Sequence, residues 1–416
     1  MQAVIAIPES VALLSEHGAA DLLTRPIAGN PLLMRTLLTA SRSGADQLLL
    51  ICPLRLSDKF IRRFTDNAAQ RGLRLEVIPV NNFDPKACSS WAILESYLRD
   101  SFLWLPWNWV TTKQYLTHLH QLTFSSVDWS KPAYTTMNEV ICDNVSSTAP
   151  YSEGIAVTSP GTAALAERFL VANAGKVLDG IHTSFNRRLC RPFVRLLSHT
   201  NITPNAVTFG GVLVSLFSAI AFAQGSYWWY LLGALLFYIA GLFDEMDGML
   251  ARVKFAESPR GTWLEGFADG LSYLLLFGGI TVGLSRHYGR PAILIGVALL
   301  IGAALAVITT SLQRRRATTP EHPQEYLGNF YKLLEKDSGN WISRVVRQIQ
   351  AFHKRGVVIH YIVLFTVMGA LPLLFLLATF GAHLTWILTL YFNRRFFSQP
   401  VQSKTKCNVN TFKEAS

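Results

Sequence analysis

The segment from Gly241 to Phe277, GLFDEMDGMLARVKFAESPRGTWLEGFADGLSYLLLF, joins two apolar runs through a short basic loop. Four acidic side chains stand where these runs meet the loop: Asp244, Asp247, Glu265 and Asp269. A carboxylate at bilayer depth costs on the order of 2.5 to 3.5 kcal/mol even on insertion scales. Acidic groups in such a place indicate that two neighbouring helices build a functional site.

The composition is that of a basic membrane protein. The 416-residue chain is 50% hydrophobic, has a mean hydropathy of +0.26 and carries a formal charge of +11. It is too apolar for one ordinary soluble domain, and its positive charge clusters beside the apolar runs, which argues against a nucleic-acid partner. The cysteines have no paired spacing, so we expect free thiols rather than disulfides or a zinc site; they are Cys52, Cys88, Cys142, Cys190 and Cys407.

The apolar runs of the second half predict six membrane spans. Residues 201–243 contain no charged residue or histidine and divide into two spans at Gln224-Gly225-Ser226. Two more spans follow at 269–285 and 291–313. Residues 356–393 divide at Gly381-Ala382-His383, which leaves a short last span around 384–396.

Basic residues beside the spans predict that both termini are cytoplasmic. They flank the first, fourth and fifth spans and outnumber Arg286 and Arg290 on the other side; they are Arg187, Arg188, Arg191, Arg195, Arg314 to Arg316, Lys354 and Arg355. The first residues, AVIAIPESVALL, follow no basic residue and do not resemble a signal peptide. We therefore expect an integral membrane protein, of a bacterial or archaeal inner membrane, with its N-terminal domain and active site in the cytoplasm.

The first half predicts a cytoplasmic α/β domain over residues 1–140. Strands are expected at 3–7 and 47–52, a helix at 31–43, and a helix followed by a strand over 59–80. Residues 141–175 are expected to form a linker and a connecting helix, and 176–200 an amphipathic helix in the membrane interface. The six-span domain then occupies 201–396, followed by a cytoplasmic tail at 397–416.

The spacing of the acids predicts a metal site. Asp244 and Asp247 are three residues apart, and Glu265 and Asp269 are four apart, so each pair projects from one face of its helix. Four converging carboxylates need neutralising cations, and hard oxygen ligands suit Mg²⁺ or Mn²⁺, with two ions expected.

The neighbouring residues predict that the ligand contains a pyrophosphate. Gly248 and Gly261 lack a Cβ atom and let backbone or phosphate approach the metal, and Arg252 can meet phosphate oxygens. Metal-assisted displacement at phosphorus is the expected reaction. The alternative is a set of structural ion pairs with Arg252, Lys254 and Arg260. A transporter would carry ionisable groups near mid-span, whereas these acids lie at span ends.

The pattern from Asp244 to Asp269 resembles the signature of the CDP-alcohol phosphotransferases, D-x2-D-G-x2-A-R-x8-G-x3-D-x3-D. The spacing matches throughout, and Glu265 replaces the third aspartate, which keeps the charge but lengthens the ligand by one methylene. The resemblance covers residues 176–396. It implies a six-span bundle preceded by an interfacial helix, in which a phospho-alcohol passes from a CDP-alcohol to a hydroxyl acceptor with release of CMP.

The resemblance also implies roles for individual residues. Asp244, Asp247, Glu265 and Asp269 would be metal ligands, and Asp269 would also be the general base. The CDP site would contain Asn205, Gly248, Ala251, Arg252 and Gly261. Arg355 corresponds to a basic position that contacts the acceptor phosphate in that family. By their charge alone, Arg187 and Arg188 are also candidates to bind an acidic acceptor, although snorkelling toward anionic lipid explains them at least as well. Membrane lipids and a second copy of the chain, as a homodimer, are the expected partners.

A second resemblance concerns the first domain. Residues 25–32, RPIAGNPL, and 44–51, GADQLLLI, are similar to a region of sugar-phosphate nucleotidyltransferases, including the bifunctional inositol-phosphate cytidylyltransferase and di-myo-inositol phosphate phosphate synthase fusions. The Gly-rich triphosphate loop is absent at 7–12, and the metal-binding aspartate is absent at 102–107. We therefore expect a catalytically inactive domain with a role in assembly or regulation.

The sequence leaves the substrates open. The donor is CDP-diacylglycerol or a soluble CDP-polyol, and the acceptor is inositol phosphate, glycerol phosphate, another polyol or a lipid alcohol. The alternative to an enzyme is a catalytically impaired scaffold of the same fold.

Overall fold

The computed structural model describes residues 1–317, with gaps at 12–19, 55, 57, 100, 120–128, 137–152 and 176–180, and residues 330–396, with gaps at 331, 336, 338 and 350–354. The expected tail at 397–416 and the expected linker at 141–152 lie outside the described residues. Two compact units are present. The N-terminal unit comprises 1–177, 191–202 and 249–256, and the helical unit comprises 178–190, 203–248 and 257–416.

The N-terminal unit contains a mixed five-stranded sheet in the order β5-β4-β1-β6-β8. Its strands are β1 (Gln2–Ala6), β4 (Gln47–Cys52), β5 (Leu75–Pro79), β6 (Ser101–Trp104) and β8 (Ala133–Thr136). β1 pairs in parallel with β4 and with β6, β4 pairs in parallel with β5, and β8 runs antiparallel to β6. The predicted α/β class is therefore confirmed for this unit.

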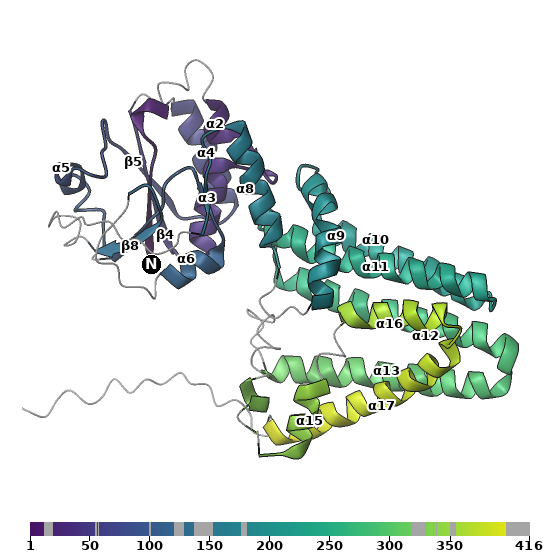
Figure 1. The fold of residues 1–416 in the computed structure, drawn as a ribbon. Helices are drawn as coiled ribbons and strands as arrows, with labels where there is room; N and C mark the ends of the chain where they lie inside the picture. The colour runs from purple at the N-terminus through teal and green to yellow at the C-terminus, as the bar shows by residue number, and fades with distance from the viewer. Residues whose placement is uncertain are drawn as a thin grey trace, which may run out of the picture. The chain divides into compact units, whose positions relative to one another are not determined.

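Short strands and helices complete the unit (Figure 1). Two small antiparallel sheets pair β2 (Pro26–Ile27) with β3 (Asn30–Pro31) and β7 (Trp109–Val110) with β9 (Ile155–Ala156). The helices are α2 (Ala20–Thr24), α3 (Leu32–Arg42), α4 (Asp58–Gln70), α5 (Cys88–Ala92), α6 (Lys113–Leu119) and α8 (Pro160–Ala172).

The core of the N-terminal unit follows from the apolar runs of its parallel strands. All residues of β1 are buried, as are five of the six residues of β4, because strands covered on both faces need continuous apolar sequence. On one side of the sheet the rings of Trp91, Trp104 and Trp129 pack with centroids 5.1 to 5.7 Å apart. Aromatic burial of this kind anchors β6 beside β1.

The helical unit is built from α-helices, most of them apolar. They are α10 (Pro204–Ala223), α11 (Tyr227–Lys254), α12 (Pro259–Tyr288), α13 (Arg290–Ala317), α15 (Trp341–Ile349), α16 (Arg355–Val367) and α17 (Leu371–Phe396). Within the described residues, five of these helices are long and apolar enough to cross a membrane. The protein is an integral membrane protein by this measure. The predicted turn between the first two spans is present, and Gly225 takes a left-handed φ of 82° there.

The predicted division of residues 356–393 is wrong. The chain turns at Met368–Ala370, where Gly369 adopts a φ of 67° and the amide of Ala370 donates to the carbonyl of Phe365. Gly381 lies inside α17 instead. His383 contacts the carbonyl of Ala298 on α13 at 3.0 Å, so this stretch packs side by side with α13 rather than forming a turn (Figure 1).

This shift changes the lengths of the last two helices. The expected short last span is a helix of 26 residues, whereas α16 has 13 residues. At about 1.5 Å per residue, the 13 described residues of α16, which follow the undescribed residues 350–354, extend over roughly 20 Å. Within the described residues, five helices are long and apolar enough to span a membrane and α16 is a shorter apolar helix, so the sixth span stays a prediction.

Helix α9 (Ile181–Ser198) has the amphipathic pattern predicted for 176–200. Residues 176–180 lie outside the described part of the chain. The exposed side chains of α9 include Phe185, Leu189, Phe193 and Leu196, and its buried ones include Asn186, Cys190 and Val194. Its location in the membrane interface stays a prediction.

Close packing of α10 against α12 sets the geometry of the site. A Cβ atom on Gly279 would overlap the carbonyl oxygen of Ala219, and one on Gly283 would overlap the carbonyl oxygen of Phe222. Glycine at these positions lets the two backbones touch. The acidic face of α12 is thereby brought next to the first turns of α10.

Candidate active site

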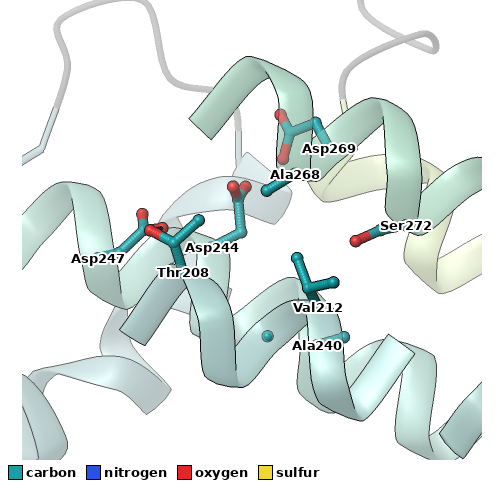
Figure 2. Close-up of a pocket in the computed structure, with 9 residues that line it drawn as sticks. Thr208, Val212, Ala240, Asp244, Asp247, Ala268, Asp269 and Ser272 are labelled. Atoms are coloured by element: carbon teal, nitrogen blue, oxygen red, sulfur yellow. Dashed lines mark hydrogen bonds between the residues drawn. The ribbon is translucent and has the colours of Figure 1, made fainter. Parts of the chain in front are cut away.

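Three helices of the helical unit line one pocket, shown in Figure 2. The lining residues are Thr208, Gly211 and Val212 of α10, Ala240, Asp244 and Asp247 of α11, and Ala268, Asp269 and Ser272 of α12. The two predicted acidic faces therefore do meet, and three of the four predicted acids line the same space.

Asp247 is the most buried of these acids, with 4% of its surface exposed. The hydroxyl of Thr208 donates a hydrogen bond to its Oδ2 atom. The Oδ1 atom is also buried, yet it has no hydrogen-bond partner among the described residues. A buried, unpartnered carboxylate oxygen costs free energy unless a cation or donor satisfies it.

That oxygen and its neighbours fit a divalent cation by their chemistry. Carboxylate oxygens are the ligands that Mg²⁺ and Mn²⁺ prefer, and Asp244 and Asp269 face the same pocket. Within the described residues, however, no three His, Cys, Asp or Glu side chains are close enough together to hold a metal ion. The carboxylates would have to close around an ion by side-chain rotation.

Glu265 differs from the other three acids. It is half-buried on α12, one turn before Asp269, and it is not among the residues that line the pocket. The longer glutamate side chain can reach positions that an aspartate cannot.

The start of α12 brings two predicted CDP-binding positions together. Ser258 caps the helix by accepting a hydrogen bond of 3.0 Å from the amide of Gly261. A Cβ atom on Gly261 would lie 3.8 Å from Oδ1 of Asn205, in the first turn of α10. The first turns of α12 and α10 therefore meet at Gly261, where a phosphate can approach the backbone.

The predicted phosphate-binding arginine lies further along α11. This helix continues without interruption from Asp247 through Gly248 and Ala251 to Arg252. Arg252 belongs to the N-terminal unit, where its Nε atom donates to the carbonyl of Ala174.

The arginines predicted for the acceptor occupy different environments. Arg187 is 9% exposed, and its Nε atom donates to Oε2 of Glu245 at 3.1 Å in an ion pair. Arg188 is exposed, and Arg355 is the first residue of α16. Arg187 therefore links α9 to α11 through Glu245, the residue after Asp244. This ion pair gives Arg187 a structural role in addition to the predicted role in acceptor binding.

The site residues predicted from the sequence did not include Thr208 and Ser272, which line the pocket, or Glu245, which pairs with Arg187. Thr208 follows the Thr203 N-cap of α10 by five residues, and Ser272 follows Asp269 by three, on the same face of α12. Glu245 is adjacent to Asp244, and successive helical residues point about 100° apart. Ser272 could have been predicted from its helical spacing to Asp269. The contact between Thr208 and Asp247 joins residues far apart in sequence, so no local pattern predicts it.

Comparison with known proteins assigns a family to most of the helical unit. Residues 201–392 match the family model for CDP-alcohol phosphatidyltransferase. These residues form a CDP-alcohol phosphatidyltransferase domain. The predicted resemblance of the second half is thereby confirmed.

Three relatives illustrate the range of proteins similar to this CDP-alcohol phosphatidyltransferase domain and its flanking residues. Cholinephosphotransferase 1 of Gallus gallus is 31% identical over 91 residues, which are 20% of this chain and 27% of that protein. The bifunctional IPC transferase and DIPP synthase of Aquifex aeolicus is 25% identical over 238 residues, 56% of this chain and 49% of that protein. The phosphatidylinositol phosphate synthase of Mycolicibacterium smegmatis is 25% identical over 115 residues, which are 27% of this chain and 50% of that protein. The chain spans about half the length of the last two relatives and about a quarter of the first.

Proposed function

We propose that this protein transfers a phospho-alcohol group from a CDP-alcohol to a hydroxyl acceptor and releases CMP, in a reaction that depends on a divalent metal. The observation that supports this most is the buried Oδ1 atom of Asp247, which has no hydrogen-bond partner in the described part of the chain and lines a pocket with Asp244 and Asp269. The family match of residues 201–392 supports the reaction class.

The residues of the pocket divide into metal ligands and a base. Asp244, Asp247 and Asp269 would hold the cation, with Glu265 joining them after rotation of its side chain. A bound divalent cation neutralises pyrophosphate oxygens and stabilises the charge that develops on the leaving group. Thr208 donates to Oδ2 of Asp247, and Oδ1 has no hydrogen-bond partner within the described residues, so it would be available to the ion. Outer hydrogen bonds of this kind orient metal-binding carboxylates.

The proposed reaction balances in one displacement. Asp269 accepts the proton of the acceptor hydroxyl, and the acceptor oxygen attacks the phosphorus that carries the donor alcohol. The bond from that phosphorus to the bridging oxygen breaks, and CMP departs with this oxygen. A divalent cation held by Asp244 and Asp247 would offset the repulsion between these carboxylates and the phosphate oxygens of the donor, so we expect the reaction to depend on the metal.

The test compares Asp247→Asn with a matched control, Asp66→Asn, which changes an exposed aspartate on α4. We expect Asp247→Asn to lose CMP release with CDP-diacylglycerol and with CDP-polyol donors, because the amide cannot ligate the ion with the same charge. The control should match the parent protein. Equal turnover by Asp247→Asn in excess magnesium would contradict the site, and a parent protein that is inactive with every donor would favour the scaffold alternative.

We also propose that the N-terminal domain has no nucleotidyltransferase activity. Ligands of open α/β sheets bind beyond the carboxyl ends of the strands. Beyond β1 and β6 the amides of Ile7 and Leu105 already donate to the carbonyls of Ile51 and Val4, at 2.9 and 3.0 Å, and both side chains are buried. These amides are therefore not directed toward a triphosphate.

A further inference from the structure

The C-terminal end of α11 has an unusual conformation. The amide of Ala256 donates to the carbonyl of Ala251 at 2.8 Å, and the amide of Phe255 donates to that of Arg252 at 3.3 Å, which together form a Schellman motif. The left-handed residue of that motif is Phe255, with a φ of 56°. Glycine usually occupies this position, because a side chain there strains the backbone.

A buried arginine of the N-terminal domain holds this turn in place. Arg35 on α3 is 1% exposed, and its Nη2 atom donates to the carbonyl of Val253 at 2.7 Å. That carbonyl lies in the last turn of α11, where carbonyls lack a partner within the helix. The guanidinium also lies over the ring of Phe255, 5.0 Å from its centroid. Arg35 thus contacts both the open carbonyl and the strained residue.

The environment fixes Arg35 itself. Its Nε and Nη2 atoms donate to the carbonyls of Ile27 and Ala28, at 2.8 and 3.0 Å, in the turn between β2 and β3. Burial lowers the pKa of Arg35 to about 9, and the nearby Glu167 carboxylate opposes this, so the guanidinium stays charged at neutral pH. Gly29 in the same turn packs against the carbonyl of Ser198, where a Cβ atom would overlap that oxygen.

The turn that Arg35 holds contains residues of the transferase signature. Ala251 and Arg252 supply the two carbonyls of the Schellman motif, and the Nε atom of Arg252 donates to the carbonyl of Ala174. The described contacts of this segment with residues before 178 therefore involve its backbone, its strained residue and its arginine. Such contacts give the N-terminal domain a way to influence the donor site without catalytic residues of its own.

We propose that Arg35 is a positioning residue for donor binding: by capping Val253 and covering Phe255, it fixes the last turn of α11 and with it the direction of Arg252. This role rests on the proposed function and on the CDP-binding role that the signature resemblance gives Arg252. The N-terminal domain then acts on the reaction through the shape of α11 and without chemistry of its own.

The first test measures the turn without using activity. Hydrogen exchange of the full chain in detergent should show faster exchange at the amides of Phe255 and Ala256 in Arg35→Met, by roughly tenfold or more, since a charge-assisted bond is lost. Arg63→Met, an exposed arginine on α4, is the matched control and should leave these amides at the parental rate. Parental exchange in Arg35→Met would overturn the proposal.

The second test measures donor binding. Arg35→Met should raise the KM for the CDP-alcohol roughly tenfold with kcat nearly unchanged, and it should add little to Arg252→Met, because both changes remove the same interaction. Phe255→Gly removes the backbone strain, so Arg35→Met should cost less in that background. A KM effect of equal size in both backgrounds would overturn the role of the turn.

The two tests separate the two proposals. If the parent protein releases no CMP from any CDP-alcohol, the proposed function fails, and the donor-binding part of this inference fails with it. The exchange of Phe255 and Ala256 would still decide whether Arg35 holds the turn. If the parent is active and only Arg35→Met is unfolded, Arg35→Lys, which keeps a donor for the carbonyl of Val253, should restore the turn with an intermediate KM.

Discussion

Removing the hydroxyl of Thr208 should weaken metal binding without removing a metal ligand. In Thr208→Val the side chain keeps its shape, but Oδ2 of Asp247 loses its donor in a site where only 4% of that residue is exposed. A hydrogen bond to a charged group contributes about 1.5 to 3 kcal/mol. At about 1.4 kcal/mol per factor of ten, this corresponds to roughly 10- to 150-fold, similar to the 10- to 100-fold measured for outer-shell partners of metal ligands.

The assay is a magnesium titration of CMP release at a saturating CDP-alcohol concentration. We expect the half-saturating magnesium concentration to rise roughly 10- to 100-fold in Thr208→Val, with the rate at saturating metal near that of the parent. Thr208→Ser should remain close to the parent, because it keeps the donor. Manganese should recover more activity than magnesium, because its ligand geometry is less strict.

A matched control separates the metal effect from general loss of packing. Thr281→Val makes the same substitution on α12, where the hydroxyl donates to the carbonyl of Phe277 at 2.7 Å rather than to an acid. This variant should leave the magnesium titration unchanged. A parental magnesium half-saturation in Thr208→Val, or an equal shift in Thr281→Val, would refute the view that Thr208 orients a metal ligand.

Three further predictions concern other parts of the chain. Glu265→Gln should lose most CMP release while Glu265→Asp keeps part of it, because the amide keeps the shape but not the charge; equal activity of both variants would remove Glu265 from the site. Gly279→Ala should lower the thermal midpoint in detergent, since its Cβ atom would overlap the carbonyl of Ala219, at a cost of about 1 to 3 kcal/mol, whereas Gly278→Ala, with nothing within 4 Å, should not. Incubation of the full chain with CTP and polyol phosphates should release no pyrophosphate, and robust release would show a second active site.

Periodic signals in the sequence predicted much of the fold. The buried strand Gln47–Cys52 was predicted with its observed bounds, because a run of apolar residues between turn residues is a local signal. The turn at Gly225 was also predicted, since glycine there takes a left-handed φ. The spacing of Asp244, Asp247 and Asp269 was sufficient to place these acids on two helix faces that share a pocket.

The sequence did not show which of two glycines forms the turn between the last two apolar helices. Gly369 and Gly381 both interrupt an apolar run, and the choice depends on whether α13 offers a surface for His383. That surface consists of residues about 85 positions away, so no local pattern encodes it. The bounds of α16 and α17 were therefore decided by tertiary packing.

The sequence by itself determined which of the predicted acids share a helix face, because residue type and helical spacing fix this. Only the tertiary structure decided how those acids are held. Thr208 reaches Asp247 across 39 positions, and Arg35 reaches Val253 across 218. Both contacts satisfy buried polar atoms, and a chain can satisfy such atoms with any partner that the fold brings near. Their identity therefore depends on long-range packing rather than on any local sequence signal.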